Sequence, residues 1–65
     1  MMYKVRIYGL VNGQEDLIVV DYFQSLPEAH NWAYDNVYEK GDWAEIINTQ
    51  TGITEMKIYY EECAV

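Results

Sequence analysis

His30 is the only histidine in the chain, so it is the first residue to consider as a catalytic base. A general base must lie within hydrogen-bond distance of a nucleophile or an acid. Glu28 and Tyr34 are its neighbours on one side of a predicted helix. Ordinary packing on a helix produces the same spacing. We therefore expect His30 to be a packing residue.

The other reactive side chains do not form a catalytic or metal-binding set. Cys63 is the only cysteine, so the chain cannot form an internal disulfide, and one cysteine with one histidine cannot build a zinc site. No glycine-rich loop follows a strand, and no Ser, His and acid stand in a pattern that indicates a hydrolase. We expect no enzyme activity, no metal and no cofactor.

The composition indicates one small folded domain. The 65 residues suffice for a single domain, 1–65, with 61–65 as a flexible tail, and 51% of them are hydrophobic. The net charge of −7 argues against nucleic-acid binding, which requires Lys and Arg to contact phosphates. Because no apolar run is long enough to span a membrane and no signal peptide is present, we expect a cytoplasmic protein with no membrane partner.

The segment from Ser25 to Gly41 has helical periodicity. Ser25 can cap a free backbone N–H, Glu28 completes a capping box, and Pro27 suits the first turn. Gly41 suits the left-handed residue that ends a helix, so the predicted helix is about 15 residues long. The face expected to pack on a sheet consists of Leu26, Ala29, His30, Ala33 and Val37.

A hairpin is predicted before this helix. Residues 2–11 alternate between apolar and polar, Asn12-Gly13 is a strong two-residue hairpin signal, and 15–23 form the return strand. The loop length fixes the register. The expected pairs are Tyr3–Tyr22, Val5–Val20 and Ile7–Ile18 on the core face, and Lys4–Asp21, Arg6–Val19, Tyr8–Leu17 and Leu10–Glu15 on the other.

A second hairpin is predicted after the helix, with strands 43–48 and 53–60. A three-residue loop with Gly52 in the left-handed conformation pairs Ile46 with Met56 and Trp43 with Tyr59. A four-residue loop is the alternative, but it turns Glu45 into the core.

The order hairpin, helix, hairpin is that of the β-grasp folds, and the chain resembles the immunoglobulin-binding domains of streptococcal protein G. The matching stretches are Tyr3-Lys4-Val5 with Ile7 and Gly9, Ala33-Tyr34-Asp35-Asn36, and Gly41-Asp42-Trp43. The resemblance implies an α+β fold with a four-stranded mixed sheet of order 2-1-4-3, crossed by one helix. It also implies Asn36, Asp42 and Trp43 as the positions that match antibody-binding residues. The lysines and glutamine of the family's helix are absent, so we do not expect immunoglobulin binding.

One helix can cover only one face of the sheet, and the other face is expected to be unusually apolar. The residues expected there are Arg6, Tyr8, Leu17, Val19, Trp43, Ile47, Lys57 and Tyr59. An exposed apolar patch on a small protein is typical of an interface, and Tyr, Trp and Arg are enriched at binding hot spots. We predict a non-enzymatic protein-binding module that uses this face, with a second copy of the chain as one candidate partner.

A row of acidic residues suggests an alternative function. Glu28, Asp35, Glu39 and Asp42 are spaced by helical turns. Such a row could imitate nucleic-acid phosphates and bind a basic surface, as an inhibitor from a phage or mobile element would. The same row is also expected on any solvent-exposed helix face.

Overall fold

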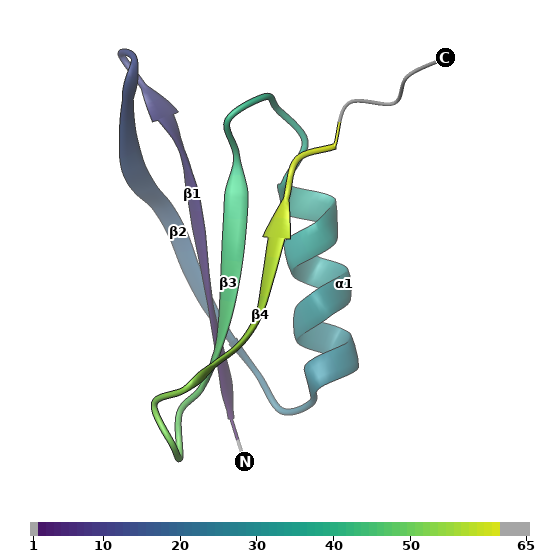
Figure 1. Cartoon of the computed structure of the whole chain (residues 1–65). Helices are drawn as coiled ribbons and strands as arrows, with labels where there is room; N and C mark the ends of the chain where they lie inside the picture. Colours follow the sequence, from purple (N-terminus) through teal and green to yellow (C-terminus); the bar gives the residue numbers. More distant parts are fainter. Residues whose placement is uncertain (1, 62–65) are drawn as a thin grey trace.

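The computed structural model describes residues 2–61 and has an α+β fold. Its elements are β1 (Tyr3–Val11), β2 (Gln14–Phe23), α1 (Leu26–Asn36), β3 (Trp43–Asn48) and β4 (Thr54–Tyr59). The four strands form one sheet, and α1 packs against one of its faces (Figure 1). The predicted number, type and order of elements along the chain are therefore confirmed.

The arrangement of the strands differs from the β-grasp order. The sheet has the order β2-β1-β3-β4, and all three pairings are antiparallel, so the expected mixed sheet of order 2-1-4-3 is wrong. The strand next to β1 is β3, whose Ala44 and Ile46 are fully buried. The edge position goes to β4, which carries Glu55 and Lys57. Charged side chains are common on edge strands, so the more polar strand of the hairpin lies outside.

The first hairpin has the predicted turn but an unpredicted bulge. Asn12 and Gly13 both have positive φ, 53° and 80°, as a primed two-residue turn requires. The predicted register holds from Val11–Gln14 to Tyr8–Leu17. A bulge then leaves Ile18 unpaired, and Ile7 pairs with Val19 instead. An extra residue shifts all later pairs by one, so the predicted pairs beyond Tyr8 are wrong.

The second hairpin has the predicted register from Trp43–Tyr59 to Ile46–Met56, but its loop is longer than predicted. Ile47 pairs with Thr54, so Glu55 is skipped, and the N–H of Asn48 donates to the carbonyl of Ile53. The loop therefore has four residues, 49–52, and not the predicted three. Trp43 pairs with Tyr59 and Ile46 with Met56, and Gly52 adopts φ 74°. The backbone N–H of Gly52 donates to the carbonyl of Asn48 and closes the loop. The four-residue loop of the alternative therefore occurs, but the irregularity at Glu55 restores the predicted pairing of Glu45 with Lys57, so Glu45 does not face the core.

The helix begins as predicted and ends about one turn early. Ser25 accepts a hydrogen bond from the backbone N–H of Glu28 at 3.3 Å. The last helical residue is Asn36, whereas the sequence suggested Lys40. The Asp42 carboxylate explains the early end, because it accepts from the backbone N–H of Glu39, which a longer helix would need for its own ladder.

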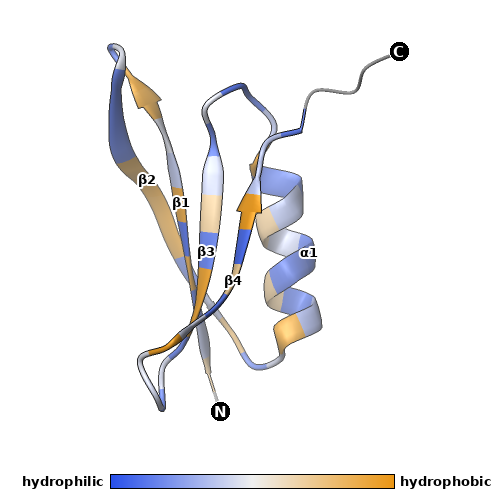
Figure 2. Ribbon diagram, viewed as in Figure 1, coloured by the Kyte–Doolittle hydropathy of each residue, from blue (hydrophilic) through white to orange (hydrophobic). Residues whose placement is uncertain are grey.

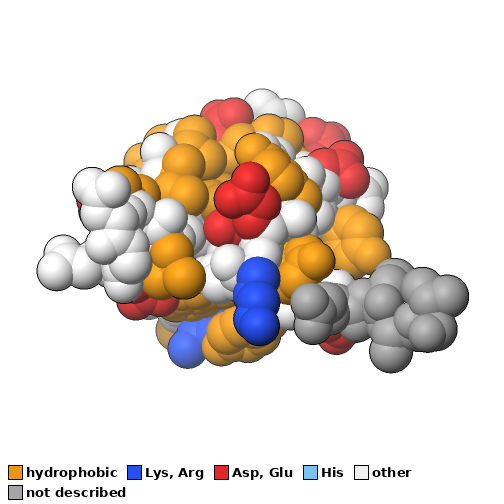
Figure 3. All heavy atoms as spheres, turned by 90° about the horizontal axis from the view of Figure 1, so that it is seen from above, with side chains coloured by type: hydrophobic (Ala, Val, Ile, Leu, Met, Phe, Trp, Pro, Cys, Tyr) orange, Lys and Arg blue, Asp and Glu red, His pale blue; other side chains and the backbone are white. Residues whose placement is uncertain are grey.

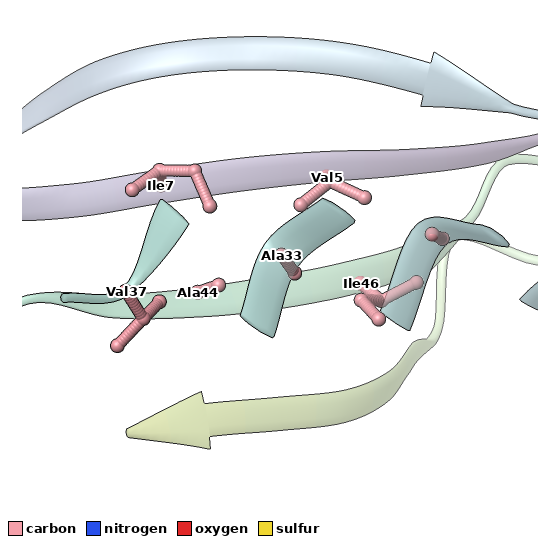
Figure 4. Close-up of a cluster of buried hydrophobic side chains, with 7 residues drawn as sticks. Val5, Ile7, Ala33, Val37, Ala44 and Ile46 are labelled. Atoms are coloured by element: carbon pink, nitrogen blue, oxygen red, sulfur yellow. The ribbon is translucent and has the colours of Figure 1, made fainter. Parts of the chain in front are cut away.

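The core lies between α1 and the two central strands. Small helix residues let α1 lie close to the sheet, and Figure 4 shows them facing branched residues of β1 and β3. The fully packed residues are Val5, Ile7, Ala29, Ala33, Val37, Ala44 and Ile46. Figure 2 shows the corresponding alternation of hydrophobic and hydrophilic residues along β1 and β4. Of the five residues predicted to face the sheet, Ala29, Ala33 and Val37 are buried in the core and Leu26 packs against it. His30 is half-buried, and its ring lies against Tyr34.

Candidate functional site: the open face of the sheet

We call the sheet face opposite α1 the open face. Paired residues in neighbouring strands point to the same side, so the register determines its members. Three rows cross it, each with one residue from β2, β1, β3 and β4 in that order: Leu17, Tyr8, Trp43 and Tyr59; Val20, Arg6, Glu45 and Lys57; Tyr22, Lys4, Ile47 and Thr54. All the predicted open-face residues except Val19 are among them.

Val19 is a correction to the predicted site. The bulge at Ile18 pairs Val19 with Ile7, a core residue, so Val19 faces the helix side. The same shift places Val20 and Tyr22 on the open face, where the sequence had not predicted them. No hairpin signal marks such a bulge, so alternation counted from the turn assigns the wrong face to these residues.

The first row is a ladder of stacked rings. The rings of Tyr8 and Trp43 are 4.5 Å apart at their centroids and inclined by 15°. On the other side of Trp43, the Tyr59 ring lies 5.9 Å away at 17°. Trp43 is thus held between two rings from neighbouring strands. Leu17, 46% exposed, extends the row to the far edge.

Polar contacts fix the position of the Trp43 ring further. Its indole Nε1–H donates to a carboxylate oxygen of Glu15 on β2. The ammonium group of Lys57 lies 5.8 Å from the centre of the ring, a cation–π distance. The open face therefore presents an aromatic centre whose middle ring, that of Trp43, has contacts on all these sides.

Glu45 is the centre of a small polar cluster in the second row. Its Oε1 accepts from the Tyr8 hydroxyl at 2.9 Å and pairs with the Arg6 guanidinium at 3.3 Å. Burial and this hydrogen bond to Glu45 raise the pKa of Tyr8 above its ordinary value. The cluster joins β1 to β3 and satisfies the one carboxylate in the middle of the face.

The charge of the chain is distributed unevenly. Lys4, Arg6 and Lys57 lie on the open face, and the one other basic residue, Lys40, lies in the loop before β3. In Figure 3 the Lys and Arg side chains in view lie in the lower half of the molecule, next to hydrophobic side chains. The three rows of the open face thus carry these three positive charges and one negative charge, Glu45, although the protein has a net charge of −7.

The predicted acidic row does not form one continuous surface. Glu28 and Asp35 are exposed on α1, but Glu39 lies beyond the end of the helix. Asp42 is 9% exposed and holds the turn at Glu39, so its role is structural.

The three positions that match antibody-binding residues do not make a common surface either. Asp42 is buried, and Trp43 belongs to the ring ladder on the open face. The Asn36 side chain donates to the carbonyl of Trp32 within α1, on the helix side of the sheet.

The candidates for chemistry remain isolated. The ring of His30 stacks loosely on Tyr34, with 6.2 Å between centroids. Residues 2–61 form no pocket and contain no group of His, Cys, Asp or Glu side chains that could hold a metal ion. In the same range no helix is long and apolar enough to cross a membrane. Cys63 lies outside the described residues.

No family model matches this chain. The search of curated proteins and the search of solved structures also return no match. The function must therefore be argued from the geometry of the open face.

Proposed function

We propose that this chain is a non-enzymatic protein-binding module, that the open face is its contact surface, and that a second copy of the chain is a partner this surface fits. The ring ladder Tyr8–Trp43–Tyr59 carries the proposal. Tyr and Trp are the types that dominate binding hot spots, and these rings are already ordered. Binding of a partner to these rings would therefore cost little side-chain conformational entropy.

The shape of the molecule supports the same surface. The described part measures 36 × 28 × 15 Å, so its broad surfaces are the two sides of the sheet, and α1 covers one of them. A stable dimer buries about 800 Å² from each copy. The open face is the broad surface still available for a contact of that size.

The charge distribution favours a second copy as the partner. Two chains of net charge −7 repel each other through most of their surfaces. The open face combines Lys4, Arg6 and Lys57 with Glu15 and Glu45, so two such faces can meet without large repulsion. Stacking them would also bury a second apolar layer, which would stabilise a domain whose small size leaves little apolar surface to bury.

Two adjacent residues of similar exposure allow a matched test. Leu17 is 46% exposed on the open face, and Ile18 is 54% exposed with its side chain over Gly9 on the helix side. Light scattering over a range of micromolar concentrations should give a mass above that of the monomer for the wild type. Leu17→Glu should lower this mass, and Ile18→Glu should not. A monomeric wild type, or equal effects of both variants, would contradict self-association through the open face.

A further inference from the structure

The two edges of the sheet differ in whether side chains accept hydrogen bonds from the backbone N–H groups that point away from the sheet. On β2, the outward N–H of Leu17 donates to the Asp16 carboxylate at 2.9 Å. The outward N–H of Tyr22 donates to the Asp21 carboxylate at 2.8 Å. These carboxylates and the bulge at Ile18 block the addition of another strand along β2.

Among the described residues, no side chain protects the outer edge of β4 in this way. The N–H of Tyr60 donates to the carbonyl of Asp42, so the ladder bonds to β3 come from Met56, Ile58 and Tyr60. Lys57 and Tyr59 therefore direct their N–H and C=O groups outward. No side chain among residues 2–61 accepts from these N–H groups. The Lys57 side chain, which could shield the edge, lies over Trp43 instead.

We infer that β4 is a self-association edge, at which two copies of the chain pair antiparallel about Ile58 and form one continuous eight-stranded sheet. This contact uses backbone groups of β4 and does not depend on the role proposed for the open face.

The charges of the side chains and the extent of the regular part of β4 determine the register in which the two β4 strands pair. Pairing about Lys57 would place two Lys57 side chains directly opposite, which is destabilising. In a register centred on Met56, the outward groups of Lys57 in one copy would bond to those of Glu55 in the other. The regular pairing of β4 with β3 is broken at Glu55. Pairing about Ile58 uses only the regular part of the strand. It joins the outward groups of Lys57 in one copy to those of Tyr59 in the other.

The side chains also match in this register. On the helix side, Ile58 meets Ile58 of the other copy, and both are apolar. On the open face, each Lys57 lies beside the Tyr59 ring of the other copy, a pairing with cation–π character. The aromatic row of one copy would continue directly into the open face of the next.

Disulfide trapping tests the register. In a non-hydrogen-bonded antiparallel pair the Cα atoms are about 4.5 Å apart, within the range that a disulfide spans. With Cys63→Ser as background, Ile58→Cys should give a covalent dimer on mild oxidation. Met56→Cys, on the same side of the same strand, should stay monomeric. No dimer from Ile58→Cys, or an equal yield from Met56→Cys, would overturn the inference.

Amide hydrogen exchange of the wild type provides a second test that requires no substitution. The amides of Lys57 and Tyr59 should exchange more slowly as the protein concentration rises. The amides of exposed α1 residues such as Asn31 and Asp35 should not change. Exchange at Lys57 and Tyr59 that is independent of concentration would overturn the inference.

Discussion

The rings of Tyr8 and Trp43 stack at 4.5 Å across the two central strands, although the two residues are far apart in the sequence. The contact exists because β3 is the neighbour of β1, where Tyr8 pairs directly with Trp43. Tyr59 then closes the other side of the Trp43 ring. The strand order therefore determines the surface on which the proposed function depends.

Tyr8 should give the stability of the protein a specific dependence on high pH. Its pKa is raised in the folded state by burial and by Glu45, so the folded protein holds this proton more tightly than the unfolded chain. The stabilisation is complete below about pH 10, the ordinary pKa of tyrosine, and is lost as the pH rises through the folded-state value. Tyr8→Phe should therefore lower the free energy of unfolding at neutral pH, and the difference from wild type should shrink above about pH 10.

Urea unfolding followed by tryptophan fluorescence, at neutral pH and at high pH, measures this difference. The other tyrosines are common to both proteins, so they cancel in the comparison. If the free energies of unfolding of wild type and Tyr8→Phe differ by the same amount at every pH, a raised pKa of Tyr8 in the folded state is contradicted.

Gly9→Ala should destabilise the fold through lack of space. A Cβ at this position would meet Cδ1 of Ile18 and would lie 2.7 Å from Oδ1 of Asp42. Asp42 cannot move freely, because it holds the turn at Glu39. We expect a loss of about 1–3 kcal/mol in the free energy of unfolding, as for other overpacked sites.

Ile18→Ala should reduce this penalty, since it removes one of the two clashing groups. Chemical denaturation of the wild type, the two single variants and the double variant gives the coupling energy. If the two substitutions have additive effects on the free energy of unfolding, a clash with Ile18 is not the cause of the destabilisation by Gly9→Ala.

Asp42→Ala should separate the structural role of this carboxylate from a role in binding. We expect a loss of about 1–2 kcal/mol, because the backbone N–H of Glu39 loses its charged acceptor. Glu39→Gln is the matched control: its side chain is exposed, and stability should change little. Thermal unfolding compares the two. If Asp42→Ala is as stable as Glu39→Gln, the structural role of the Asp42 carboxylate is contradicted.

Local signals in the sequence correctly predicted the positions of the two hairpin turns and the start of the helix. Asn12-Gly13, Gly52 and Ser25 each act through nearby backbone geometry, and each did so here. The end of the helix depends on Asp42, which caps the chain from beyond the periodic segment. A pattern read along the helix alone could not reveal that contact.

The strand order and part of the site required information that local patterns do not contain. Either strand of the second hairpin could have paired with β1, since each alternates regularly. The charges on β4, Glu55 and Lys57, were a usable signal for an edge strand. The bulge at Ile18 had no such signal, and it moved Val19 off the open face and Val20 onto it.

A dilution series of amide and indole NMR spectra tests the central claim most directly. Diluting the protein from millimolar to micromolar concentration should shift the resonances of the open face, above all the indole N–H of Trp43 and the amides of Tyr8 and Leu17. The resonances of exposed α1 residues such as Asn31 and Asp35 should stay constant. Spectra that do not change with concentration, or shifts confined to α1, would contradict self-association through the open face.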